Sequence, residues 1–208
     1  MMDRRTFFRT VAAAGGATLL VASQGNALRF FPNTGKQKWA VLFGSRYGAT
    51  RDAAVWISEG MGGIADVFDA RENPDLSSFE AIVVGSGIYM GKIDTPLEGF
   101  LARNAPPYSS RTRDFSSRVR ALFLVCGAGD TPRGQGFLEG LTKACGVKPP
   151  LTKVFSGRLT KRLLNAEDYK VEEEVARRRN QPYADYDRLQ RTDCLKFGEE
   201  VLAKSVAG

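Results

Sequence analysis

The chain of 208 residues contains no histidine. This absence excludes Ser-His-Asp and Cys-His catalysis, and with them His-based metal sites and histidine proton shuttles. Only three cysteines are present, Cys126, Cys145 and Cys194, and they form no CxxC pair. Their wide spacing argues against iron–sulfur and zinc clusters, and their odd number argues against a disulfide scaffold. We therefore expect three buried thiols that pack as small apolar residues, and no metal site.

Long hydrophobic runs are also missing. The apolar stretch at residues 11–22 is too short, and too rich in Ala and Gly, to span a bilayer comfortably. It follows the basic segment "DRRTFFR" (3–9), which resembles a twin-arginine export motif, and it precedes the small residues of 25–27. We expect a signal peptide at 1–27 and a linker at 28–37. The mature protein is then periplasmic, or anchored to the membrane where the signal is retained.

The net charge of +7 favours anionic partners, such as a membrane surface, an acidic protein or a carboxylate-bearing ligand. The basic residues are scattered, and neither a recognition-helix pattern nor an RNP-like pattern is present, so no nucleic-acid partner is expected.

Short apolar runs alternate with longer helical patterns along the rest of the chain. The runs predict strands at 38–43, 65–70, 81–85, 120–127 and 153–157, and helices are predicted at 49–63, 94–105, 131–146 and 183–205. In the helix at 94–105, Thr95 is the expected cap and Glu98 completes a capping box. This alternation predicts an α/β domain at 38–208, a doubly wound parallel sheet of five strands in the order 2-1-3-4-5. Residues 158–182 do not fit the alternation and read as an insertion, with a short charged helical segment at "KVEEEVARRR".

Three loops should meet where the winding of such a sheet reverses, beyond the carboxyl ends of the strands. They are "GSRYGAT" (44–50), "SGIYMGK" (86–92) and "GAGDTPRG" (127–134). The first carries hydroxyl groups and glycines before a helix N-terminus, which suits a phosphate. No Lys-Ser/Thr pair follows this loop and no GxGxxG is present, so a nucleotide-hydrolysing P-loop is excluded here and a dinucleotide fold is disfavoured. A phosphomonoester held without Mg²⁺ fits best.

The pattern of Ser45, Tyr47, Gly48 and Thr50 resembles the phosphate loop of the flavodoxin family. The resemblance implies FMN as the cofactor, with chemistry carried out on the flavin rather than by a catalytic side chain. Its phosphate would lie on Ser45, Arg46, Tyr47, Gly48, Ala49 and Thr50. Its ring would be flanked by Ser86, Gly87, Ile88, Tyr89, Gly91, Cys126, Gly127, Ala128 and Gly129.

Some side chains near these loops allow two readings. Tyr89 either stacks on the flavin or is a half-buried loop aromatic, and Ile88 and Met90 either shape the ring pocket or pack beneath it. Lys92 and Arg133 either face an anionic ligand or are solvated. Cys126 is read as an inert core thiol rather than a redox-active one.

The run "AIVVGSGIYMGKIDTPLEGFLARNA" (81–105) is similar, more narrowly, to flavodoxin-domain proteins related to menaquinone-dependent protoporphyrinogen oxidase. We therefore expect an exported FMN-dependent oxidoreductase that exchanges electrons with a quinone, a porphyrinogen or a similar partner. The basic charge favours two-electron chemistry, because positive charge near a flavin stabilises its reduced form. The alternatives are a one-electron carrier for a membrane or periplasmic redox protein, and a flavin-free binding module that kept the fold.

Overall fold

A parallel β-sheet forms the centre of the protein in the computed structural model, which describes residues 37–105 and 112–206. Its main strands are β1 (Trp39–Gly44), β2 (Ala65–Asp69), β3 (Ala81–Tyr89), β5 (Val119–Cys126) and β6 (Leu151–Ser156). They lie in the order β2-β1-β3-β5-β6, all in parallel pairs. The predicted doubly wound α/β fold is confirmed, since this is the order 2-1-3-4-5 once the short β4 (Lys92–Ile93) is set aside.

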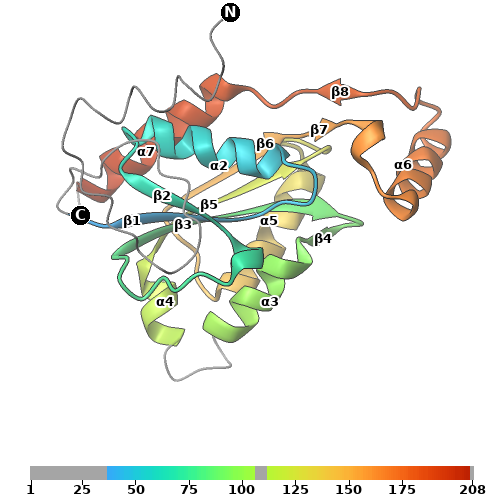
Figure 1. The fold of residues 1–208 in the computed structure, drawn as a ribbon. Coiled ribbons are helices and arrows are strands. Elements are labelled where there is room, and N and C mark those ends of the chain that lie inside the picture. Colours follow the sequence, from blue (N-terminus) through green and yellow to red (C-terminus); the bar gives the residue numbers. More distant parts are fainter. Residues whose placement is uncertain (1–36, 106–111, 207–208) are drawn as a thin grey trace, which may run out of the picture.

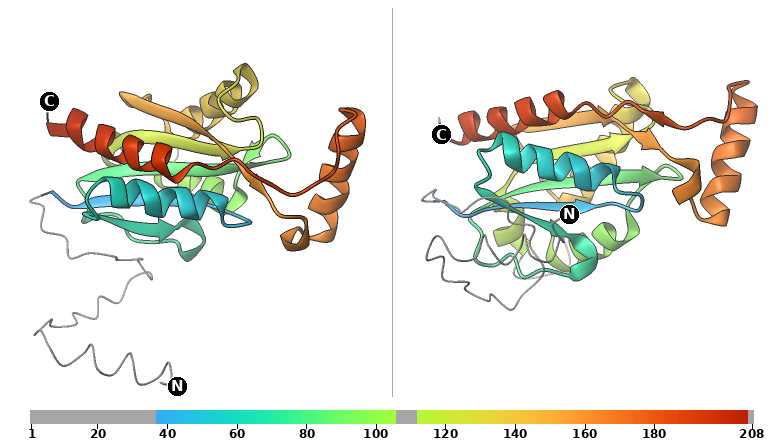
Figure 2. Two further views of the ribbon diagram at one scale, coloured as in Figure 1. Left: turned by 90° about the horizontal axis from the view of Figure 1, so that it is seen from above. Right: turned by 45° about the horizontal axis from the view of Figure 1, so that its top comes forward.

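Helices cover both faces of the sheet (Figure 1). One face carries α2 (Ala49–Gly60) and α7 (Arg191–Val206), which run side by side in both views of Figure 2. The other face carries α3 (Thr95–Asn104), α4 (Thr112–Arg118) and α5 (Pro132–Cys145). A short 3-10 turn, η2 (Ala70–Glu72), follows β2.

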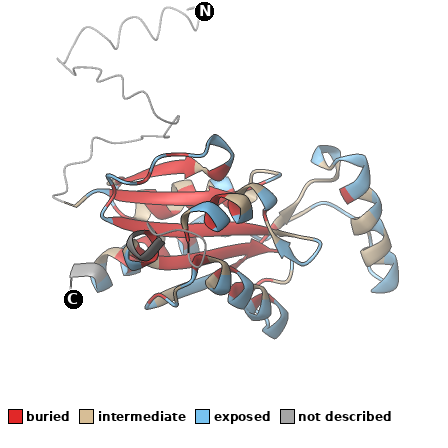
Figure 3. Cartoon of the chain, turned by 90° about the horizontal axis from the view of Figure 1, so that it is seen from below, coloured by how far each residue is buried: buried red, intermediate tan, exposed pale blue. Residues whose placement is uncertain are grey.

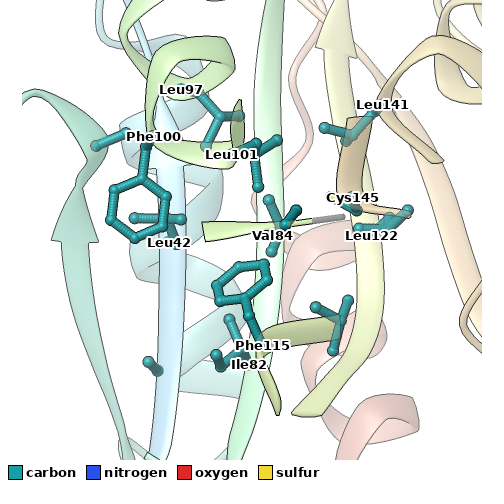
Figure 4. Packing of buried hydrophobic residues seen from close by; sticks show 14 of the residues in the cluster. Leu42, Ile82, Val84, Leu97, Phe100, Leu101, Phe115, Leu122, Leu141 and Cys145 are labelled. Atoms are coloured by element: carbon teal, nitrogen blue, oxygen red, sulfur yellow. The ribbon is translucent and has the colours of Figure 1, made fainter. Parts of the chain in front are cut away.

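The sheet separates two hydrophobic cores, and every residue of β1 is buried between them (Figure 3). On the α3 side, Leu42 and Val84 of the strands pack with Leu97, Phe100 and Leu101 of α3 (Figure 4). Each large side chain buried in this way stabilises the fold by roughly 1.5–3 kcal/mol. Continuous apolar strands follow from this arrangement, because both faces of the sheet are covered.

A smaller unit lies between β6 and α7. It contains β7 (Arg158–Leu159), η3 (Lys161–Leu163), α6 (Ala166–Arg178) and β8 (Tyr186–Asp187). Strands β7 and β8 form an antiparallel pair separate from the main sheet, and α6 stands beside the sheet rather than on either face (Figure 1). Glu174 forms ion pairs with Arg177 and Arg178 on the outer side of α6.

Three local predictions were wrong. Residues 86–92 are not an open loop, because β3 continues to Tyr89 and turns through Met90 and Gly91 to pair with β4. The last helix begins at Arg191 rather than at 183, since the preceding segment binds the smaller unit: the Lys161 N–H donates to the Asp185 carboxylate at 2.9 Å. Helix α3 is capped one residue earlier than expected, with the Glu98 N–H donating to the Asp94 carbonyl at 2.9 Å.

The prediction of three buried, unpaired thiols is confirmed: Cys126, Cys145 and Cys194 are all buried and free. The arginine pair and the proposed cleavage site lie outside the described residues. Within the described part of the chain, no helix combines the length and the hydrophobicity needed to cross a membrane.

Candidate functional site

A cavity of about 280 Å³ opens at the carboxyl ends of β1, β3 and β5. Each of the three predicted loops contributes to its wall. The contributing residues are Tyr47, Ala49 and Thr50, then Gly87, Ile88, Tyr89, Met90 and Gly91, then Cys126, Gly127 and Ala128. The other predicted site residues, Ser45, Arg46, Gly48, Ser86 and Gly129, are not among the residues that line the cavity. The strand order therefore brings distant segments of the chain to one site.

The loop between β1 and α2 has the geometry of an anion cradle. Gly48 precedes α2 with φ of +89°, a backbone conformation that side-chain-bearing residues rarely adopt. Its N–H donates to the Ser45 hydroxyl at 3.1 Å, which fixes the turn. Thr50 is buried in the first turn of α2. Helix N-termini carry unpaired N–H groups and a partial positive charge, so this loop favours a bound anion.

The hydroxyl of Tyr89 lies inside this cradle. The Arg46 N–H donates to it at 2.6 Å. A Cβ atom built on Gly87 would lie 2.8 Å from the Tyr89 hydroxyl and 3.0 Å from the Thr50 hydroxyl, so the two oxygens face the same small space. Burial raises the pKa of Tyr89, so the phenol is neutral at neutral pH. The loop thus already holds an oxygen atom where an anion would be expected.

The second loop is the turn of the β3–β4 hairpin. Ser86 is fully buried and holds the hairpin, because its hydroxyl accepts the Asp94 N–H at 2.9 Å and donates to the Gly87 carbonyl at 2.7 Å. Ile88 packs against the core on the α3 side, and also lines the cavity. Met90 is 64% exposed at the turn and has φ of +50°, so an apolar side chain stands at the edge of the cavity.

The third loop passes beneath Tyr186 of β8. A Cβ atom on Gly127 would lie 2.6 Å from the Tyr186 hydroxyl, so the loop backbone and this side chain approach each other closely. Gly129 turns the chain with φ of +59°, and its N–H donates to the Cys126 carbonyl at 3.1 Å. Burial raises the pKa of the Cys126 thiol, which favours the inert reading of this cysteine.

Helix α6 forms the outer wall of the cavity. Asp168, Val171, Glu172, Val175 and Arg179 line it at helical spacing, from one side of α6 and the residue that follows it. Burial raises the pKa of the Glu172 carboxyl, and the nearby Arg179 only partly offsets this.

Asp168 attaches α6 to the cradle. Its carboxylate accepts the Arg46 guanidinium at 2.7 Å and the Tyr47 hydroxyl, and its own N–H is capped by Asn165. The side chain is only 9% exposed. Burial alone would raise the pKa of Asp168, but the hydrogen bonds from Tyr47 and Arg46 outweigh it and hold the pKa below its usual value.

Positive charge gathers around the cavity. Arg158 is held by Asp52 at 2.6 Å, whereas Arg133 and Arg179 are exposed at its edge, and Arg133 lies over the ring of Phe137 at 5.8 Å. Lys92 is exposed on β4 and is not among the lining residues. Within residues 37–105 and 112–206, no group of three or more His, Cys, Asp or Glu residues is arranged to hold a metal ion.

The contribution of the segment after β6 was missed from the sequence. The sequence pattern predicts only a charged, exposed segment around α6 and places Tyr186 on the last helix, whereas both line the cavity. Val171 and Val175 are the signal that was available, since an apolar pair at i, i+4 on a charged helix marks a face that packs against something.

Comparisons with known proteins agree with this architecture. A family model described as "Flavodoxin domain" matches residues 40–179. No curated protein matches the chain.

Three solved structures illustrate the similarity found among known folds. A flavodoxin from the domain Archaea is 18% identical over 80% of this chain and 97% of its own, with a TM-score of 0.44. The Trp repressor binding protein of Bacillus subtilis is 14% identical over 79% of this chain and 97% of its own, with a TM-score of 0.49. A flavoprotein of Lactobacillus acidophilus NCFM, in complex with FMN, is 13% identical over 57% of this chain and 93% of its own, with a TM-score of 0.41.

Proposed function

The chain belongs to the flavodoxin domain family, and on this basis we propose that it is an FMN-dependent oxidoreductase. The observation that carries the proposal is the convergence of three loops on one cavity, with an oxygen-binding cradle at one end. The Arg46 N–H of the cradle donates to the Tyr89 hydroxyl, so this donor points to where a phosphate oxygen would lie. When bound, FMN supplies the electron-transfer chemistry, and the protein supplies binding, orientation and charge.

The 45–50 loop would hold the phosphate through the N–H groups of Arg46 and the α2 N-terminus and through the Thr50 hydroxyl. The hairpin residues Gly87 to Gly91 and the loop at Cys126 to Gly129 would flank the ring. Helix α6 would cover it and limit the entry of water. Arg133 and Arg179 would stabilise negative charge that develops in the cavity.

We extend the proposal to a quinone, a porphyrinogen or a similar acceptor as the redox partner, in a reaction like that of menaquinone-dependent protoporphyrinogen oxidase or of a quinone reductase. Support comes from the sequence at 81–105, from the net charge of +7 and from the exposed arginines at the cavity edge. The alternative, a one-electron carrier, is favoured by Met90, since an exposed apolar side chain beside the cavity suits contact with a partner protein. Rapid turnover of small quinones would favour the enzyme, and reduction of protein acceptors alone would favour the carrier.

Binding of FMN to the full-length protein, stripped of flavin, tests the cofactor assignment. Isothermal titration calorimetry should show FMN binding with one site per chain. Thr50→Val should weaken FMN binding about tenfold or more, since a hydrogen bond to a charged phosphate is lost, while riboflavin binding should hardly change. Thr142→Val on α5, whose hydroxyl donates only to its own helix, is the matched control. Equal FMN affinity in all three proteins would show that this loop does not bind the phosphate of FMN.

We also propose that residues 1–27 direct export to the periplasm, and that the positive charge brings the mature protein to an anionic membrane surface. Replacing Arg4 and Arg5 together by Lys should leave the protein in the cytoplasm, as measured by cell fractionation and by mass spectrometry of its N-terminus. A wild-type protein that keeps Met1 and stays in the cytoplasm would contradict the assignment.

A further inference from the structure

The position of Tyr89 is not explained by core packing alone. Its ring belongs to the end of β3, but its hydroxyl reaches across to the loop that follows β1 and accepts the Arg46 N–H at 2.6 Å. Burial raises the pKa of Tyr89 overall, although the Tyr47 backbone and the Ser45 side chain lower it. The phenol therefore uses a donor, the Arg46 N–H, that a phosphate bound to this loop would need.

Two neighbours hold the Tyr89 ring in this position. The Arg46 guanidinium lies 4.5 Å from the centre of the ring, and the Tyr47 ring meets it edge-on at 5.9 Å. Both neighbours belong to the cradle itself. Tyr89 is thus in contact with the 45–50 loop through its face, its edge and its hydroxyl.

The phenol and a phosphate cannot occupy the cradle together. The Arg46 N–H already donates to the Tyr89 hydroxyl at 2.6 Å, so a phosphate oxygen that accepts from this N–H must take the place of the phenol oxygen. A ligand that reaches the Arg46 N–H must first move Tyr89. The cost of this displacement is part of the binding free energy.

We propose that Tyr89 is an internal, displaceable ligand of the 45–50 loop, and that it determines which ligands the loop accepts. A phosphomonoester dianion displaces the neutral phenol, because hydrogen bonds to an ionised acceptor are about twice as strong as those between neutral groups. A neutral alcohol, such as the terminal hydroxyl of riboflavin, does not. The inference rests on the proposed function for the identity of the ligand, but the displacement itself concerns any phosphate.

Tyr89→Phe is the direct test, because it keeps the ring and removes only the oxygen. In this variant the Arg46 N–H has no partner before ligand binds, so the free protein is destabilised relative to the complex. We expect the Kd for FMN and for inorganic phosphate to fall roughly threefold to tenfold, the value of one hydrogen bond. The Kd for riboflavin should stay unchanged. Tyr183→Phe, which removes a hydroxyl that donates to the Tyr169 carbonyl outside the cavity, is the matched control.

Two measurements on flavin-free protein support the titrations and do not depend on redox activity. Amide hydrogen exchange at Arg46 should be faster in Tyr89→Phe than in the wild type, and phosphate should slow it in both. In the wild type, nuclear Overhauser contacts between the Tyr89 ring and the Thr50 side chain should disappear at saturating phosphate.

The outcomes separate the two proposals. Equal Kd values for FMN in the wild type and in Tyr89→Phe, or Thr50 contacts that persist at saturating phosphate, would overturn the role of Tyr89 and leave FMN binding intact. If neither protein bound FMN but phosphate bound more tightly to Tyr89→Phe, the cofactor assignment would fail and the role of Tyr89 would stand. If neither ligand bound to either protein, both proposals would fail.

Discussion

Asp168 joins two segments of the chain that lie 122 positions apart. Its carboxylate, buried against the cradle, receives hydrogen bonds from Arg46 and Tyr47. Because these bonds hold its folded-state pKa below the unfolded value, the stability that it contributes is present above the unfolded pKa. That contribution is lost as the pH falls through the folded pKa.

Removing this charge should loosen α6 without unfolding the sheet. We expect Asp168→Asn to lower the opening free energy of α6 by on the order of 1–3 kcal/mol, the value of hydrogen bonds to a charged group. Amide exchange, corrected for intrinsic rates, should show the loss at neutral pH. It should also show the wild type approaching the variant below about pH 4. Glu173→Gln, an exposed position on the same helix, is the control and should change nothing. Equal protection of α6 in all three proteins at neutral pH would show that Asp168 does not hold the helix.

The turn between β1 and α2 could be predicted because its sequence signal is local. Ser45, Gly48 and Thr50 stand within six positions, directly after an apolar strand and before a helix, and this order predicts a phosphate loop. Asp168 has no such signal. Asp168 reaches its partners because the chain passes through β7 and η3 before α6. The spacing of residues in the sequence does not predict this tertiary contact.

At the scale of elements, α2 and α7 cross at two glycines. A Cβ atom on Gly198 would overlap the Ile57 carbonyl, and one on Gly60 would overlap the Leu195 carbonyl. The two helix backbones therefore approach more closely than side chains would allow.

A single methyl group at this crossing should force the helices apart. We expect Gly198→Ala to lower the free energy of unfolding by about 1–3 kcal/mol or more, as for an overpacked core. Gly140→Ala on α5 meets nothing within 4 Å and is the control. It should raise stability by about 0.5–1 kcal/mol, since alanine favours a helix over glycine. Urea unfolding curves measure both changes, and a stable Gly198→Ala would show that the helices separate freely.

Element type was more predictable than element limits. The periodicities at 49–63 and 131–146 predicted helices correctly, because one face of each packs on the sheet. The limits of β3 and α7 were wrong for tertiary reasons. Strand β3 continues because β4 offers it a partner, and α7 starts late because the residues before it pair with β7.

At the scale of the whole molecule, the net positive charge should increase the rate at which the protein meets an anionic redox partner. If the acceptor is a small quinone, oxidation of the reduced protein by 1,2-naphthoquinone-4-sulfonate should slow severalfold between about 10 mM and about 150 mM salt, because salt screens long-range attraction. Oxidation by uncharged 1,2-naphthoquinone should hardly respond. Stopped-flow kinetics measure both rates, and identical salt dependence for the two quinones would show that the net charge does not steer the acceptor.

The way α6 is attached has a kinetic consequence. The helix lies outside the two cores, and its link to the cradle is a small polar cluster around Asp168 rather than a broad apolar contact. Units held in this way open far more often than the core that supports them. We therefore expect a ligand beneath α6 to leave when this helix opens, before the sheet loses structure. Its residence time would then depend on the opening of α6, so that exchange of the cofactor and resistance to denaturation could vary independently in this protein.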